Sequence, residues 1–121
     1  MSATFPKSEK LCGQIHIAAL YKRGKRLTVW PLRVTYLNLP PDETEKTKVL
    51  IWAPKSLFHH AVDRNHLRRL MREAYRKNKT DIENCHLQVA FNYIDKQQQP
   101  YPVIERAMQK AIRKIVETNP I

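Results

Sequence analysis

The sequence is poor in cysteine, glycine and acidic residues, and it has no long apolar run. The two cysteines, Cys12 and Cys85, are too few for a disulfide scaffold and fit a reducing compartment. The two glycines cannot form a glycine-rich phosphate loop. No run approaches the roughly 18 apolar residues of a membrane-spanning helix, and residues 1–7 lack the apolar core of a signal peptide. We therefore expect a cytoplasmic protein with no membrane partner.

Positive charge is what the chain has in excess. Its 121 residues include 22 Lys+Arg and 11 Asp+Glu, a formal net charge of +11, which predicts a polyanionic partner such as nucleic acid. The few acids form no paired-carboxylate site for two-metal hydrolysis, since those of 42–45 lie in an expected turn. A hydrophobic content of 42% predicts a folded chain. We expect a flexible arm at 1–7 and a single domain at 8–121.

The apolar periodicity predicts an α+β fold in which helices pack on one sheet. The helices are expected at about 13–23, 61–78 and 102–117, and the strands at about 32–37, 48–54 and 86–94, with an extra short strand before Pro31. The composition of 39–47 predicts a hairpin connection between the first two main strands. The near-continuous apolar run of the strand at 48–54 favours a central position in the sheet.

The segment Ala61-Val-Asp-Arg-Asn-His-Leu-Arg-Arg-Leu-Met-Arg-Glu-Ala-Tyr-Arg76 has two chemically different faces as a helix. Helical geometry gathers one apolar stripe: Leu67, Leu70, Met71 and Ala74. It gathers the basic and amide groups on a separate arc: Arg64, Asn65, Arg68, Arg69, Arg72 and Arg76. Guanidinium groups stay charged and can donate paired hydrogen bonds to phosphate, so this arc predicts a nucleic-acid interface. The alternative is a solvated basic surface.

This segment resembles the characteristic helix of the bacterial ribonuclease P protein component, whose core reads Arg-Asn-Arg-x-(Lys/Arg)-Arg-x-x-Arg-(Glu/Gln). The matching residues are Arg64, Asn65, Arg68, Arg69, Arg72 and Glu73. The flanks are similar too, because Leu20-Tyr-Lys-Arg-Gly24 resembles the family's Phe-Lys-x-Gly ending of the first helix, and Pro54-Lys55 resembles its Ser-Lys-Lys loop. The resemblance covers roughly residues 8–117.

The resemblance implies an α/β sandwich with a left-handed strand–helix–strand crossover. It implies that the chain works with a large catalytic RNA to remove the 5′ leader of precursor tRNA by Mg²⁺-dependent hydrolysis. The RNA would carry the catalytic metals, so the chain itself would hold neither a catalytic residue nor a metal, and no obligate protein partner is expected. The leader would lie in a cleft between the sheet and the first helix, and the residues assigned to it are Ile17, Tyr21, Arg33 and Lys55.

Two positions depart from the family pattern. His66 stands where the family usually has a second arginine, so an RNA contact through this side chain could depend on pH. Ile17 stands where many members have a phenylalanine, and an aliphatic side chain cannot stack on a base. Tyr21 still can, and such a contact is worth about 1–3 kcal/mol in single-strand binding.

Other interpretations stay open at this point. Tyr21 could pack in the core, Arg33 could decorate an exposed strand face, and Trp30 and Trp52 are expected in the core or at its rim. The spacing of Cys12 and His16 fits metal ligands, but no second pair lies nearby, which favours chance. A ribosomal or other structural RNA-binding protein would share the same charge and size. A DNA-binding regulator is disfavoured, because it would need a helix where 48–54 is expected to form a strand.

Overall fold

A computed structural model describes residues 14–38, 47–82 and 86–118. The elements are α1 (Gln14–Arg23), β1 (Lys25–Val29), β2 (Leu32–Asn38), β3 (Lys48–Trp52), α2 (Ala61–Asn78), the short 3-10 helix η2 (Lys79–Asp81), β4 (Leu87–Tyr93) and α3 (Tyr101–Thr118). The three predicted helices and the extra strand before Pro31 are confirmed, the latter as β1. The expected arm at 1–7, both cysteines and the acids of 42–45 lie outside the described residues.

The four strands form one mixed sheet in the order β1-β2-β4-β3. β2 runs antiparallel to both β1 and β4, whereas β3 runs parallel to β4. Two predictions are therefore wrong: β2 and β3 form no hairpin, because β4 lies between them, and β3 lies at an edge of the sheet. The α2 helix makes the crossover from β3 to β4, and the left hand implied for it stays a prediction.

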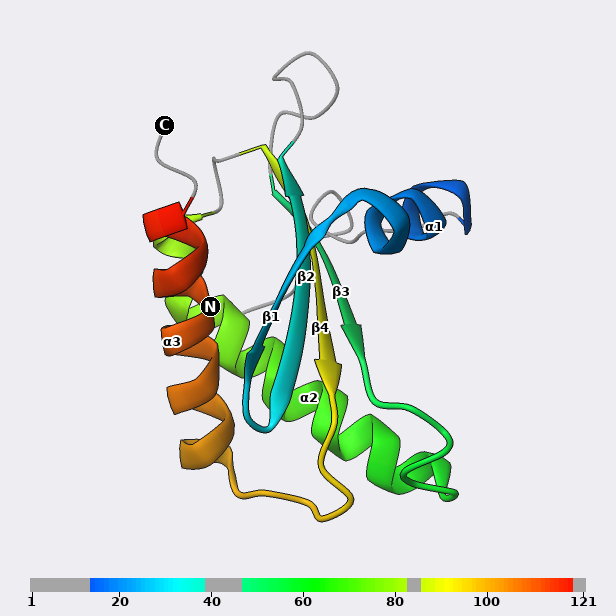
Figure 1. The fold of residues 1–121 in the computed structure, drawn as a ribbon. Coiled ribbons are helices and arrows are strands. Elements are labelled where there is room, and N and C mark those ends of the chain that lie inside the picture. The colour runs from blue at the N-terminus through cyan, green and yellow to red at the C-terminus, as the bar shows by residue number, and fades with distance from the viewer. Residues whose placement is uncertain (1–13, 39–46, 83–85, 119–121) are drawn as a thin grey trace.

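The main core lies between one face of the sheet and the pair α2 and α3. Alternating residues of β2 and β4 point into it, and the register places Val34 opposite Phe91. The predicted apolar stripe of α2 packs here, with Leu67, Met71 and Ala74 buried and Leu70 partly buried. Figure 1 shows α2 and α3 on the side of the sheet opposite α1. The predicted α+β class is confirmed.

The α1 helix covers part of the other sheet face through a small second cluster. Leu20 and Ala90 are fully buried in it, and Ile17 and Tyr21 pack against them. The helix ends at Gly24, whose N–H donates to the Leu20 carbonyl at 2.7 Å. A Cβ atom at this position would lie 2.5 Å from that carbonyl oxygen and 2.9 Å from the Tyr36 oxygen. Glycine therefore permits α1 to turn directly into β1 while staying close to the sheet.

Candidate nucleic-acid interface

The basic arc of α2 faces away from the core, as predicted. We call this arc, together with the neighbouring His66, the arginine face. Its residues, all exposed or half-buried, are Arg64, Asn65, His66, Arg68, Arg69, Arg72 and Arg76. Tyr75, which lies next to the predicted stripe around the helix, is also fully buried. Burial of that stripe fixes the rotation of α2 about its axis, so the arginine face is held toward solvent.

Arg64 is partly engaged in supporting the helix start. Its Nη1 atom donates to the carbonyl oxygens of Phe58 and His59 at 2.8 and 3.0 Å. The N-cap residue His60 makes no side-chain capping hydrogen bond. Arg64 therefore connects the loop after β3 to the first turn of α2. Its side chain has this structural role in addition to the predicted role in RNA binding.

Arg68 connects the arginine face to the sheet. Its Nη2 atom donates to Oδ1 of Asn65, and its Cζ atom lies 6.0 Å from the ring centroid of Trp52 on β3. A guanidinium at about 6 Å from an indole is at the limit of a cation–π contact. The helix surface and the end of β3 are therefore continuous at this point.

Arg72 lies in a concentration of like charge. Burial, and then repulsion from Arg68 and Arg69, lower the pKa of the Arg72 guanidinium below its ordinary value. It remains protonated at neutral pH, because guanidinium groups in proteins do not lose their proton there. The three cations repel one another in the isolated protein, and a polyanion lying on this face would relieve that repulsion.

Arg76 differs from its neighbours because it has an acidic partner. Its Nε and Nη2 atoms donate to the two carboxylate oxygens of Glu73 at 3.1 and 2.9 Å, and Lys77 lies 3.8 Å from the same carboxylate. The hydrogen bond from Arg76 lowers the pKa of Glu73 and raises that of Arg76. Part of the charge of Arg76 is thus neutralised within the protein.

The sheet face on the α1 side carries a row of residues that the register aligns. Arg33 of β2 is opposite Thr28 of β1 and Asn92 of β4, and Asn92 is opposite Trp52 of β3. Directly opposed residues point to the same face of a sheet. We call Thr28, Arg33, Asn92 and Trp52 the sheet row, and its two end residues lie on the two edge strands.

Tyr21 of α1 is anchored to this row. Its hydroxyl oxygen lies 2.9 Å from Nδ2 and 3.1 Å from Oδ1 of Asn92. Tyr21 is half-buried, so it packs on the sheet, as one interpretation held, and remains partly exposed. Ile17, one turn earlier, packs in the same small cluster. Lys55 is exposed in the loop three residues after Trp52.

The structure thus brings Tyr21 and Arg33 together through Asn92, a residue that sequence reasoning missed. Of the two places expected for the tryptophans, the core and its rim, the structure excludes the core, because Trp30 is 56% and Trp52 is 46% exposed. The pairing of β3 with β4 placed Trp52 in the row, and this long-range pairing leaves no local pattern in the sequence. The sequence feature that could have pointed to Trp52 is the position of a tryptophan at the end of an apolar strand.

Metal ligands and membrane spans were sought among the described residues. No group of three or more His, Cys, Asp or Glu side chains there is arranged to hold a metal ion. No described helix combines the length and the apolar character that a membrane crossing requires.

Comparison with known proteins decides the family. The model of the family described as Ribonuclease P matches residues 5–116. A ribonuclease P protein component of Porphyromonas gingivalis is 34% identical over 126 residues, covering 98% of this chain and 92% of the relative. This chain belongs to the ribonuclease P protein family. Its relative from Chlorobium phaeobacteroides is 35% identical over 102 residues, which cover 73% of this chain and 70% of that protein.

Solved structures of ribonuclease P proteins share the fold. The Staphylococcus aureus protein superposes with a TM-score of 0.76 at 19% identity, covering 93% of this chain and 99% of that one. The Thermotoga maritima protein gives a TM-score of 0.74 at 18% identity, covering 88% and 96%. The family of this chain supplies the protein component of a ribonucleoprotein endonuclease. The sequence resemblance is confirmed at the level of family and fold.

Proposed function

We propose that this ribonuclease P protein binds the catalytic RNA through its arginine face and holds the single-stranded 5′ leader of precursor tRNA on the sheet row. The observation that carries the proposal is the contact between Arg68 and Trp52. It makes a basic helical surface continuous with a surface of aromatic and amide groups. Folded RNA presents mainly phosphates, whereas a single strand also presents unstacked bases, so each surface suits one of the two partners.

The division of chemistry follows from what the side chains offer. The arginine face can bind phosphate by charge and paired hydrogen bonds, but a guanidinium at neutral pH has no lone pair to act as a base. The described residues contain no cluster suited to a metal ion, so we propose that Mg²⁺ is held mainly by the RNA and the substrate. In this proposal the chain binds and orients RNA and supplies no catalytic residue, and it requires no protein partner.

The leader would lie across the row beside α1. Tyr21 offers a ring for stacking, held in place by Asn92, and Arg33 lies next to it across the strand pair. Trp52 adds a second exposed ring at the β3 edge, and Lys55 adds charge just beyond it. Ile17 contributes apolar packing in place of a stacking ring.

Reconstitution tests the whole proposal. The protein is added to a bacterial ribonuclease P RNA at a Mg²⁺ concentration too low for the RNA alone, and leader removal from precursor tRNA is measured. We expect the protein to restore cleavage and the double substitution Arg68→Ala and Arg69→Ala to weaken RNA binding and flatten its salt dependence. The matched control, Lys96→Ala with Arg113→Ala, removes two exposed cations elsewhere. Cleavage no faster than with RNA alone would refute the proposal.

The leader surface has its own test in Tyr21. Replacement by alanine removes the ring and should weaken the affinity for precursor tRNA by about 1–3 kcal/mol, the worth of one stacked base. Replacement by phenylalanine keeps the ring and loses only the contact with Asn92. We expect Tyr21→Phe to retain most of the affinity. Affinity for mature tRNA, which has no leader, should be the same for both variants, and a loss there would contradict the assignment.

A further inference from the structure

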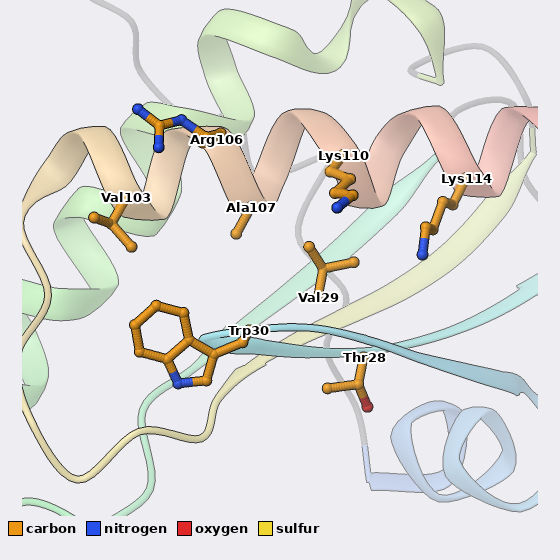
Figure 2. A pocket seen from close by; sticks show the side chains of 8 residues that line it. All are labelled: Thr28, Val29, Trp30, Val103, Arg106, Ala107, Lys110 and Lys114. Carbon is orange, nitrogen blue, oxygen red and sulfur yellow. The ribbon is translucent and has the colours of Figure 1, made fainter.

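A groove lined by basic residues lies between β1 and α3, away from the arginine face. It has a volume of about 350 Å³. Thr28, Val29 and Trp30 line it from β1 and the following turn, and Ala107, Lys110 and Lys114 line it from α3. In Figure 2 the side chains of Val29 and Ala107 point toward each other across the groove. Both are buried, so they form an apolar floor under a charged rim.

The rim of this groove carries charge of one sign. Arg106, Lys110 and Lys114 follow one another at four-residue spacing, which is about 6 Å along a helix axis. No acidic side chain lines the groove. The described residues show no hydrogen bond or ion pair for Arg106 or Lys110. The groove therefore attracts an anion with several charges spaced along a line.

Trp30 supplies an exposed aromatic surface at one end of the groove. It is the most exposed of the two tryptophans, and it sits in the turn between β1 and β2. The turn is well anchored, because Pro31 is buried and its carbonyl accepts a hydrogen bond of 2.9 Å from the N–H of Ile94. Figure 2 shows the indole ring beside Val103 and Ala107 of α3. An exposed ring next to a line of cations is the combination that binds single-stranded nucleic acid.

The groove is continuous with the sheet row at Thr28. This residue lines the groove and is also the β1 member of the row, opposite Arg33. Its side chain points away from α3, toward the side on which α1 lies, as Figure 2 shows. Neighbouring strands are about 4.8 Å apart, so only about 10 Å separates Asn92 from Thr28 across the sheet. A strand leaving the row can therefore pass over the β1 edge into the groove.

We propose that the groove between β1 and α3 binds the distal part of the same single-stranded leader, upstream of the nucleotides on the sheet row. A base stacks on Trp30, and Lys110, Lys114 and Arg106 contact the phosphates that follow. The inference rests on the proposed leader binding by the row. Duplex RNA fits less well, because its bases are already stacked on one another and cannot cover the indole ring.

Leader length provides the test. The affinity of the holoenzyme is measured for precursor tRNAs with leaders of about 5 and about 15 nucleotides, which span the site sizes of single-strand-binding domains. We expect Trp30→Ala to weaken binding of the long leader by about fivefold or more, as for loss of one stacked base, and to leave the short leader unchanged. Trp30→Phe should retain most of the long-leader affinity.

The charged rim has a matched pair of variants on one helix. Lys110→Gln removes a groove cation, whereas Arg113→Gln removes a cation that lines a different pocket with Asn78 and Asp81. For the long leader, Lys110→Gln should reduce the slope of log affinity against log salt by about 0.7, the value for one phosphate contact in a single strand. Arg113→Gln should not change that slope.

Tryptophan fluorescence gives a readout independent of affinity. In a Trp52→Phe protein, Trp30 is the sole tryptophan, and base stacking should quench its emission with the long leader but not with the short one. If Trp30→Ala lowers the affinity for both leader lengths equally, the groove binds another RNA and the proposal is overturned. The proposal is also overturned if Trp30→Ala lowers neither affinity. If the wild-type protein fails to stimulate cleavage of the short-leader precursor, the proposed function fails instead.

Discussion

At the scale of single residues, the arginines of α2 share a sequence motif but have different environments. Arg64 donates to two loop carbonyls, Arg68 lies beside Trp52, and Arg76 is paired with Glu73. Arg69 is exposed, with no hydrogen bond or ion pair among the described residues. The sequence predicted which residues share the arginine face, because helical periodicity fixes that. It could not predict these partners, since they depend on loops and strands far along the chain.

Arg64→Ala should therefore lower protein stability, unlike Arg69→Ala. Hydrogen bonds to charged groups are worth about 1.5–3 kcal/mol when buried, and partial exposure of Arg64 reduces the expected loss in free energy of unfolding to about 1 kcal/mol. Arg69→Ala should change it by less than about 0.5 kcal/mol while weakening RNA binding. Urea unfolding measures the free energy of unfolding of both variants. Equal stability of the two would show that the loop contacts of Arg64 contribute nothing.

Glu73→Gln should strengthen RNA binding. The substitution releases Arg76 from its carboxylate partner, so affinity should rise and the salt slope should steepen by up to about 0.9, the value for one more neutralised phosphate. Because Arg76 lowers the pKa of Glu73, the carboxylate is charged throughout the neutral range, and the difference from wild type should disappear only as acid protonates it. Binding titrations at several salt concentrations provide the measurement. An unchanged slope would mean that Arg76 does not contact phosphate.

At the scale of elements, the position of α1 depends on one glycine. A methyl group at Gly24 would overlap two backbone oxygens, which cannot move independently of α1 and β2. We expect Gly24→Ala to cost about 1–3 kcal/mol of stability, as overpacking usually does. Because α1 carries Tyr21, leader affinity should also fall, whereas binding of the catalytic RNA through α2 should persist. Equal losses for both RNAs would indicate general unfolding rather than displacement of α1.

The errors of sequence reasoning at this scale concern the arrangement of strands. β3 was expected in the centre because of its apolar run, yet it is an edge strand. Val49 and Ile51 face the main core, and Leu50 packs against the α1 cluster, so both faces of β3 are covered. The apolar residues of a strand show that its two faces are covered by other parts of the protein. They do not show whether the strand pairs with one neighbouring strand or with two, which is what makes it an edge or a central strand. The composition of 39–47 predicted a hairpin between β2 and β3, which is wrong because β4 lies between these two strands.

At the scale of the whole molecule, the three proposed binding surfaces lie next to one another around the sheet. The arginine face meets the sheet row where Arg68 approaches Trp52, and the row meets the groove at Thr28. A net charge of +11 favours a polyanion near all three, and in the proposed function local chemistry would then distinguish folded RNA from a single strand. The charge was readable from composition, but the continuity of the surfaces required the fold.

The RNA that copurifies with this chain from cells tests the central claim most directly. The chain is isolated under native conditions at low salt, and the bound RNA is sequenced. We expect ribonuclease P RNA to be the most enriched species, accompanied by precursor tRNAs that retain their leaders, and we expect the Arg68→Ala and Arg69→Ala protein to lose this enrichment. Enrichment of ribosomal RNA, with ribonuclease P RNA at background level, would contradict the assignment and favour a structural RNA-binding protein.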